Sequence, residues 1–139
     1  MSYAFSFALQ AAVWRRLAAD PDLAALVGGA IYDAPLPPPA DAMPPDYVTL
    51  GEETVRANDT KTSTGALHDF EVTAHSGRDG FDTVKRIAAA VCVALVDAPL
   101  DLEAGRLVAL RFLRAKAERG PAPEKRRISM RFRAVVDQA

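Results

Sequence analysis

The stretch RLVALRFLRAKAERGPAPEKRRISMRFRAVV, residues 106–136, contains two runs of alternating apolar and polar side chains on either side of a Gly-Pro turn. Alternation with a period of two places successive side chains on opposite faces of a β-strand. We therefore predict a β-hairpin with strands at 106–117 and 125–136. The side chains predicted to point inward are Val108, Leu110, Phe112, Ile128, Met130, Phe132, Ala134 and Val136.

The outward face of the second predicted strand is basic. Arg127, Arg131 and Arg133 stand at even spacing and therefore on one side of the strand. Four interpretations remain open: a solvated face, cross-strand pairing with Asp69 and Glu71, a nucleic-acid surface, or a subunit interface. Nucleic acid is the weaker of these because this face has no aromatic side chain on which a base could stack. Arginine is favoured at desolvated protein contacts.

Residues 67–75 form another predicted strand, with an acidic outward face. The side chains predicted to point inward are Phe70, Val72 and Ala74, and those predicted to point outward are Asp69, Glu71, Thr73 and His75. The two histidines of the chain, His68 and His75, fall on opposite faces of this strand and about 23 Å apart at roughly 3.3 Å per residue. They cannot share a metal ion, and we interpret each as a solvated strand or strand-end residue.

The N-terminal segment is predicted to form two helices. Apolar residues recur near every fourth position over residues 4–19, which predicts one amphipathic helix. Asp20-Pro21 then supplies an N-cap and a first-turn proline for a short second helix. Gly28-Gly29 is expected to end it.

A third helix is predicted between Asp79, as its N-cap, and Pro99, as its stop. Its apolar stripe includes Cys92, which is the only cysteine of the chain. We interpret Cys92 as a small buried apolar side chain, because a reactive thiol needs an electropositive and partly exposed setting.

The middle of the chain has weaker patterns. Residues 33–46 contain six prolines and are predicted to be an extended connector, either a stiff surface loop or an arm that reaches a neighbouring subunit. Residues 47–50 are β-prone, and 51–66 are polar and predicted to be a hairpin or a mobile loop. We expect a single domain spanning residues 1–139. Its fold class is α+β, with an antiparallel or mixed sheet of four to five strands and two main helices packed on one face.

Composition and charge describe an ordinary globular chain with an internal asymmetry. Of 139 residues, 50% are apolar and 25% charged, and the formal net charge is −1. Residues 106–139 contain ten basic and three acidic residues, a balance of +7, whereas residues 1–105 contain seven and fifteen, a balance of −8. Opposite charges on two portions of a chain can neutralise each other across one sheet or between copies of the chain.

The sequence contains no recognisable catalytic, metal or cofactor motif. A single cysteine excludes an internal disulfide and fits a reducing compartment. No apolar run approaches the roughly 18 residues of a membrane span, and the N-terminus does not resemble a secretory signal. Glu52-Glu53 and Asp79/Asp82 are acidic pairs in loop and cap contexts, where acids are common. We therefore expect no catalytic residue, no cofactor, no contact with a membrane and a cytoplasmic location.

The order of these segments resembles the tail terminator, or tail completion, proteins of long-tailed phages and phage-like gene transfer agents. The resemblance extends over nearly the whole chain. It is carried by LAADPDLAALVGGAIYD at residues 17–33, YVTLGEE at 47–53 and ISMRFRAV at 128–135.

The resemblance implies structural work and not catalysis. Members of the family form a ring, usually a hexamer, that caps the tail tube, ends tube polymerisation and joins the tail to the head-proximal connector or stopper protein. The implied partners are copies of the chain, the major tail tube protein, the connector, and DNA that passes through the ring without sequence-specific binding. The implied location is the bacterial cytoplasm during assembly and then the tail-neck junction of the particle.

Two sets of charged residues are candidates for this work. We hypothesise that Arg127, Arg131 and Arg133 contact acids such as Asp69 and Glu71 on an adjacent subunit, or acids on tube protein. A second hypothesis places acids at the opening of the ring, where they would keep DNA from adhering. The candidate acids are Asp69, Glu71, Glu52 and Glu53. The alternative function is a small nucleic-acid-binding or packaging-associated protein that uses the basic C-terminal hairpin.

Overall fold

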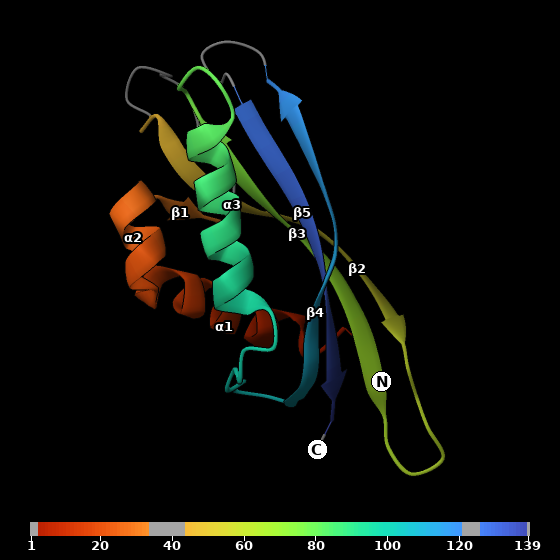
Figure 1. Cartoon of the computed structure of the whole chain (residues 1–139). Helices are drawn as coiled ribbons and strands as arrows, with labels where there is room; N and C mark the ends of the chain where they lie inside the picture. Colours follow the sequence, from red (N-terminus) through yellow and green to blue (C-terminus); the bar gives the residue numbers. More distant parts are fainter. Residues whose placement is uncertain (1–2, 34–43, 121–125, 139) are drawn as a thin grey trace.

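A computed structural model describes residues 3–33, 44–120 and 126–138. One mixed β-sheet carries all of the helices on one face (Figure 1). The helices are α1 (Ser6–Ala19), α2 (Pro21–Val27) and α3 (Asp82–Leu95), and the strands are β1 (Ile31–Tyr32), β2 (Asp46–Ala57), β3 (Gly65–Ser76), β4 (Arg106–Arg119) and β5 (Arg126–Asp137).

The five strands lie in the order β1-β2-β3-β5-β4. β1 is parallel to β2 over two residue pairs, and every other neighbouring pair is antiparallel. The predicted α+β class, the mixed sheet and the placement of helices on one face are confirmed. β1 was not predicted, because two residues give no periodic pattern and their pairing depends on a strand that follows 14 residues later.

Local sequence signals set the first two helices. The Asp20 carboxylate accepts a hydrogen bond from the Leu23 backbone N–H at 2.9 Å, so Asp20 caps α2 as predicted. Gly28 follows α2 with a φ of +62°, a conformation that glycine adopts without steric cost. The predicted ends of α1 and α2 are thus confirmed.

α3 begins later than its predicted cap. Phe81 occupies the N-cap position, and no side chain caps the helix there. The prediction that Asp79 is the N-cap is therefore wrong, because the chain first passes through Gly80, whose φ is +79°. The helix ends at Leu95, and Pro99 lies four residues further on.

The core lies between the helices and the inner face of the sheet. Helices α1, α2 and α3 pack their apolar sides onto β2, β3 and β5. Phe132 of β5 is fully buried and stacks with Phe70 of β3, with ring centroids 5.7 Å apart. The inward positions predicted for residues 128–136 of β5 and for Phe70, Val72 and Ala74 are confirmed.

Strand β4 departs from the predicted alternation. Its pairing with β5 shifts register between Leu107 and Ala109 and again between Phe112 and Arg114. The first bulge leaves Val108 51% exposed, whereas Leu110 is buried as predicted. Phe112 pairs with Phe132 on the inward face but is 44% exposed. The inward prediction is therefore wrong for Val108, and Phe112 reaches the core only by an edge contact with Phe132.

The loop that joins α3 to β4 lies against the start of α1 (Figure 1). Gly105 has a φ of +81°, and a Cβ there would lie 2.7 Å from the Phe5 ring. Only glycine allows this approach.

The polar stretch 51–66 is the distal part of a hairpin. Residues 51–57 continue β2, and β3 starts at Gly65, which accepts a hydrogen bond from the Asn58 N–H at 2.9 Å. The predicted connector at 33–46 falls, except at its two ends, outside the described residues. Most of the turn between β4 and β5 does so as well.

Candidate assembly interface

The face of the sheet without helices is strongly charged. Strand register places Asp69, Arg133 and Arg111 in one row across β3, β5 and β4. Glu71, Arg131 and Arg114 form the next row. The predicted basic row of β5 and acidic row of β3 therefore lie side by side in one chain.

Arg133 and Asp69 form an ion pair within the chain. Arg133 Nε donates to Asp69 Oδ1 at 2.8 Å, and its Nη2 donates to Oδ2 at 2.9 Å. These hydrogen bonds lower the pKa of the Asp69 carboxyl against the opposing effect of burial, and the charge of Arg133 adds to the lowering. The same pair raises the pKa of Arg133. The cross-strand pairing left open by the sequence is therefore made inside one protomer for these two residues.

Arg127 is also engaged within the chain. Its Nε donates to Glu118 Oε1 of β4 at 3.0 Å. Arg127 and Arg133 thus both have an intramolecular carboxylate, and this limits what either can offer to a neighbour.

Arg131 differs from Arg127 and Arg133 in its hydrogen bonds. Its Nη1 is buried and has no hydrogen-bond partner among the described residues. Arg131, Arg114 and Lys116 line a hollow of about 410 Å³ on the helix-free face, together with the acids Glu71 and Glu118. Lys116 Nζ lies 3.9 Å from Glu118 Oε2. Glu71 accepts a hydrogen bond from Thr73 Oγ1 at 3.4 Å. A buried guanidinium N–H without a partner is costly, so this hollow is the candidate contact site of the charged face.

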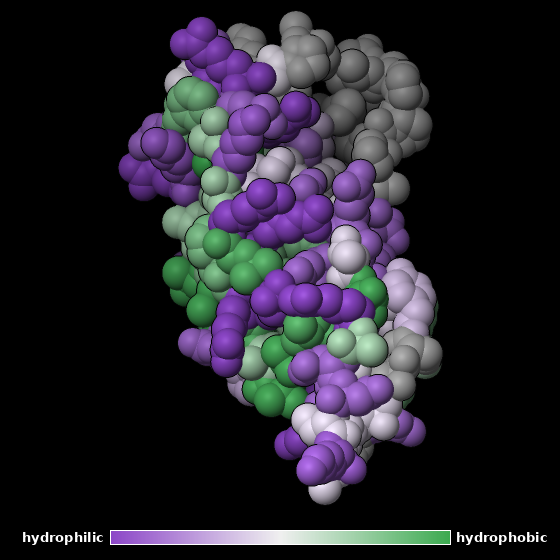
Figure 2. Space-filling model, turned by 90° about the vertical axis from the view of Figure 1, so that its right-hand side faces the viewer, coloured by the Kyte–Doolittle hydropathy of each residue, from purple (hydrophilic) through white to green (hydrophobic). Residues whose placement is uncertain are grey.

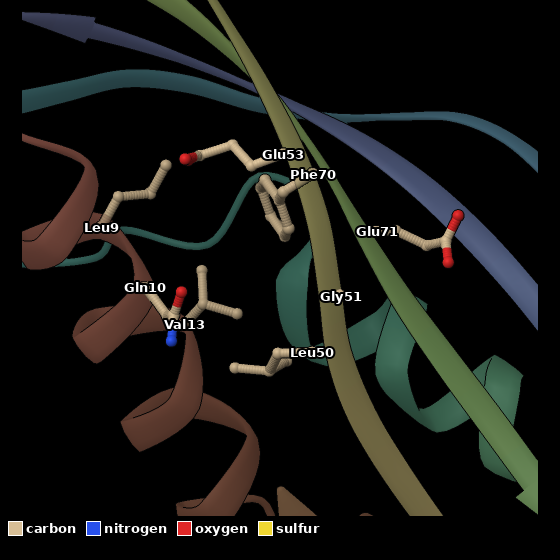
Figure 3. A pocket seen from close by; sticks show the side chains of 8 residues that line it. All are labelled: Leu9, Gln10, Val13, Leu50, Gly51, Glu53, Phe70 and Glu71. Atoms are coloured by element: carbon tan, nitrogen blue, oxygen red, sulfur yellow. The ribbon is translucent and has the colours of Figure 1, made fainter. Parts of the chain in front are cut away.

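A β-bulge separates the two candidate acids Glu52 and Glu53. β2 pairs with β3 at Leu50 and again at Glu53, so that two residues of β2 oppose Glu71 alone. The extra residue moves Glu53 to the side of the sheet that faces α1, whereas Glu71 points away from it (Figure 3). Glu52 remains exposed.

Glu53 joins a buried polar network. Ser6 Oγ of α1 donates to Glu53 Oε1 at 2.5 Å, and Glu53 Oε2 lies 3.2 Å from Nδ1 of His68. This arrangement ties the start of α1 to the bulge of β2 and to β3. Glu53 is therefore bound within the chain, whereas Glu52 is exposed.

His68 does not fit its predicted solvated position. It is fully buried on the inner face of β3 because it shares the side of Phe70 and Val72. His75, on the outer face, stacks on Tyr47 with ring centroids 4.3 Å apart and bonds to Thr49 Oγ1 at 2.9 Å. The prediction of opposite faces is confirmed, and the solvated interpretation of His68 is wrong.

Cys92 is half-buried on α3, and burial raises the pKa of its thiol. This agrees with an unreactive side chain. Among the described residues, no group of three or more potential ligands could hold a metal ion. No helix in the described ranges has the length and apolar character needed to cross a membrane.

Two features of the surface were missed from the sequence. One is the contribution of Arg114 and Lys116 to the charged hollow, which depends on the bulges of β4. The other is a second apolar side of α1, formed by Phe7 and Trp14, with Tyr3 exposed just before the helix. Its signal was present in the sequence, because these residues recur at helical spacing outside the stripe that faces the core.

Comparison with known proteins agrees with this fold. No curated protein matches the chain. The chain is similar to a chain of a solved structure described as "Virion of native gene transfer agent (GTA) particle", with 51% identity and a TM-score of 0.87, covering 98% of this chain and 99% of that one. The family model described as "Tail completion protein gp17" matches residues 11–137. The chain therefore belongs to the tail completion protein gp17 family.

Proposed function

We propose that the chain is a structural protein of a phage-like gene transfer agent particle and forms a ring that caps the tail tube. The ring ends tube polymerisation and joins the tail to the head-proximal connector or stopper protein. The similarity to a gene transfer agent virion protein over 98% of the chain supports this role. We further propose a hexamer that assembles in the bacterial cytoplasm and then occupies the tail-neck junction.

The single observation that carries the proposal is the incomplete charged hollow around Arg131. Arg131 Nη1 is buried without a partner in the described chain, and the hollow around it holds three bases, Arg131, Arg114 and Lys116, against two acids, Glu71 and Glu118. A carboxylate on an adjoining subunit or on tube protein would satisfy the guanidinium and neutralise the excess. Arg127 and Arg133 contribute less, because each already binds a carboxylate of its own chain.

The alternative, nucleic-acid binding by the C-terminal hairpin, has weaker support. Phosphate contacts need accessible cations, and two of the three outward arginines of β5 are bound to Glu118 and Asp69. DNA passing through the ring requires a surface that does not adhere to it. We assign this task to Glu52, which is exposed beside the bulge.

Particle mass tests the proposal most directly. The purified chain is measured by native mass spectrometry and electron microscopy, alone and mixed with the tail tube protein of the same particle. We expect a closed ring, or a chain that closes into a ring on the tube end, since a partner that binds only the assembled form stabilises it. A chain that stays monomeric in both samples, or tubes that lengthen without limit in its presence, would contradict the proposal.

A further inference from the structure

The edge strand β4 is held by its own chain on one side only. It pairs with β5 and lies at the opposite end of the strand order from β1. Residues 111–117 are all exposed, including Phe112 at 44% and Leu113 at 40%. Figure 2 shows hydrophobic surface exposed between hydrophilic side chains on the side of the molecule that is at the right in Figure 1. A long edge strand with exposed apolar side chains is a template for pairing with another strand.

Strand register shows which backbone groups of β4 point away from β5. In an antiparallel pair, the backbone groups of successive residues point alternately to either side of the strand. The Gln138 N–H donates to the Thr64 carbonyl at 2.9 Å, so the even-numbered residues of β5 turn their backbone groups toward β3. Ala115 and Ala117 lie opposite even-numbered residues of β5. Their own N–H and C=O groups therefore point to the outer edge of the sheet.

The outer edge of β4 is bound within the chain at one place. The Asp97 N–H donates to the Leu110 carbonyl at 3.0 Å. Beyond Leu110, no other described residue makes a backbone hydrogen bond across this edge. The outer edge of residues 111–119 is therefore open to a partner strand.

β2 has a second open edge on the other side of the sheet. β1 covers it over two residue pairs. The Asn58 N–H donates to the Gly65 carbonyl at 2.9 Å, so alternation turns the backbone groups of Val55 and Ala57 away from β3. Within the part of the chain that the structure describes, no backbone hydrogen bond reaches residues 50–57 from that side.

The two open edges match in direction and in face. β2 runs parallel to β5, and β3 and β4 run the other way, so β4 of one copy and β2 of the next would meet as antiparallel strands. Ala115 and Ala117 lie on the helix side of β4. Val55 and Ala57 lie opposite buried residues on the helix side of β3. Pairing through these four residues would therefore continue the sheet with the helices of both copies on the same face.

Charge favours β2 over a second β4 as the partner strand. Residues 111–119 contain four bases and one acid, so two copies of β4 placed side by side would repel each other. Residues 50–57 contain two acids and one base, Arg56. Arg56 lies close enough to Asp69 of its own chain to help lower the pKa of that carboxyl. The edge of β2 thus has the sign of charge that attracts β4.

We propose that β4 of one copy pairs edge to edge with β2 of the next copy, in antiparallel order, through residues 111–119 and 50–57. This inference rests on the proposed ring and names the contact that joins its subunits. Because the two edges differ, each subunit offers one edge to either neighbour, and the sheet continues from copy to copy around the ring.

Proline substitution tests the pairing at both edges. Ala115→Pro and Val55→Pro each remove an outward N–H that the ladder within the chain does not use, so the fold is retained. Each is expected to weaken association between copies by about tenfold or more in the presence of tail tube protein, because the proline ring and the missing donor prevent strand pairing there. Ala115→Ser and Val55→Thr keep the N–H and are the matched controls, which are expected to associate normally. Normal association of both proline variants would overturn the proposal.

Cross-linking reports the contact without changing the backbone. One chain carries Val55→Cys and the other Ala115→Cys, each together with Cys92→Ala. A bis-maleimide is expected to join the two chains in the mixture with tail tube protein and to give no dimer in either preparation alone. Thr62→Cys, used in place of Val55→Cys, is the control and is expected to give none. Absence of the mixed dimer would overturn the proposal, and so would a dimer of Ala115→Cys with itself, which would indicate pairing between two β4 strands.

The edge pairing and the ring fail in distinguishable ways. A mixed dimer without closed particles would retain the edge pairing and overturn the proposed ring. Closed rings without the mixed dimer would retain the ring and overturn the edge pairing.

Discussion

Arg133 and Asp69 are joined by two hydrogen bonds of 2.8 and 2.9 Å across the boundary between β5 and β3 of one chain. The next row also sets an arginine opposite an acid, Arg131 opposite Glu71, yet Arg131 Nη1 has no partner in the described chain. Two adjacent rows with equivalent charges therefore differ in their hydrogen bonds. The first row pairs β3 with β5, and we propose that a neighbouring molecule completes the second.

Replacing Asp69 by Asn tests the first row. The loss is expected to be at most about 1 kcal/mol of unfolding free energy near neutral pH, because partial solvation screens the pair. Since Asp69 has a lowered pKa in the folded protein, its contribution is complete above the carboxyl pKa of the unfolded chain, about 4. It is lost as the pH falls through the lowered value. Urea unfolding of the natural protein and the variant from pH 7 down to pH 3 measures this, with Asp101→Asn as control. A difference that does not shrink in acid would contradict the assignment.

Replacing Glu53 by Ala tests the bulge network. The change leaves His68 and the Ser6 hydroxyl without their shared partner in the interior, and the expected cost is about 2 kcal/mol of unfolding free energy. Glu52→Ala, one residue earlier and exposed, is the matched control and is expected to change stability by less than about 0.5 kcal/mol. Chemical denaturation compares the two. Equal effects would mean that the bulge does not separate their roles.

Sequence periodicity alone predicts which side chains are buried where a strand pairs without a bulge. β5 alternates from Ile128 to Val136 with every predicted inward residue buried, because it is an interior strand between β3 and β4 and has no bulge of its own. β4 follows the same pattern in sequence, but its first bulge exposes Val108. A bulge is set by the register of two strands and leaves no mark in the periodicity of one.

The sequence predicts which charged residues form the candidate site, but it does not predict which of them pair with each other. The basic face of β5 and the acidic face of β3 follow from alternation alone, whereas the adjacency of β3 and β5 depends on long-range topology. That adjacency brings Arg133 to Asp69 and Arg131 opposite Glu71. In the same way, Glu53 has the same residue type as Glu52 and differs only in the face to which the bulge turns it.

Charge reversal at Arg131 tests the second row. Arg131→Glu is expected to leave the fold intact, because Arg131 Nη1 has no partner among the described residues. Attachment to the tail tube is expected to fall by about tenfold or more, since a repulsive charge replaces the one that completes the contact. Sedimentation with tube protein at low and high salt measures this, with Lys61→Glu in an exposed loop as control. Unchanged attachment at both salt concentrations would contradict a role for this hollow in assembly.

A substitution at Glu52 tests DNA passage independently of assembly. Glu52→Lys places a cation where an exposed acid stood, and a cation at the opening of a ring would bind the DNA phosphates that pass it. Particles with this variant are expected to form normally but to deliver DNA about tenfold less often at low salt, with partial recovery as salt screens the contact. Glu103→Lys, an equal change in the loop after α3, is the comparison variant for charge alone. Electron microscopy counts complete particles, and DNA transfer per particle measures delivery. Normal delivery by complete Glu52→Lys particles would place Glu52 away from the path of the DNA.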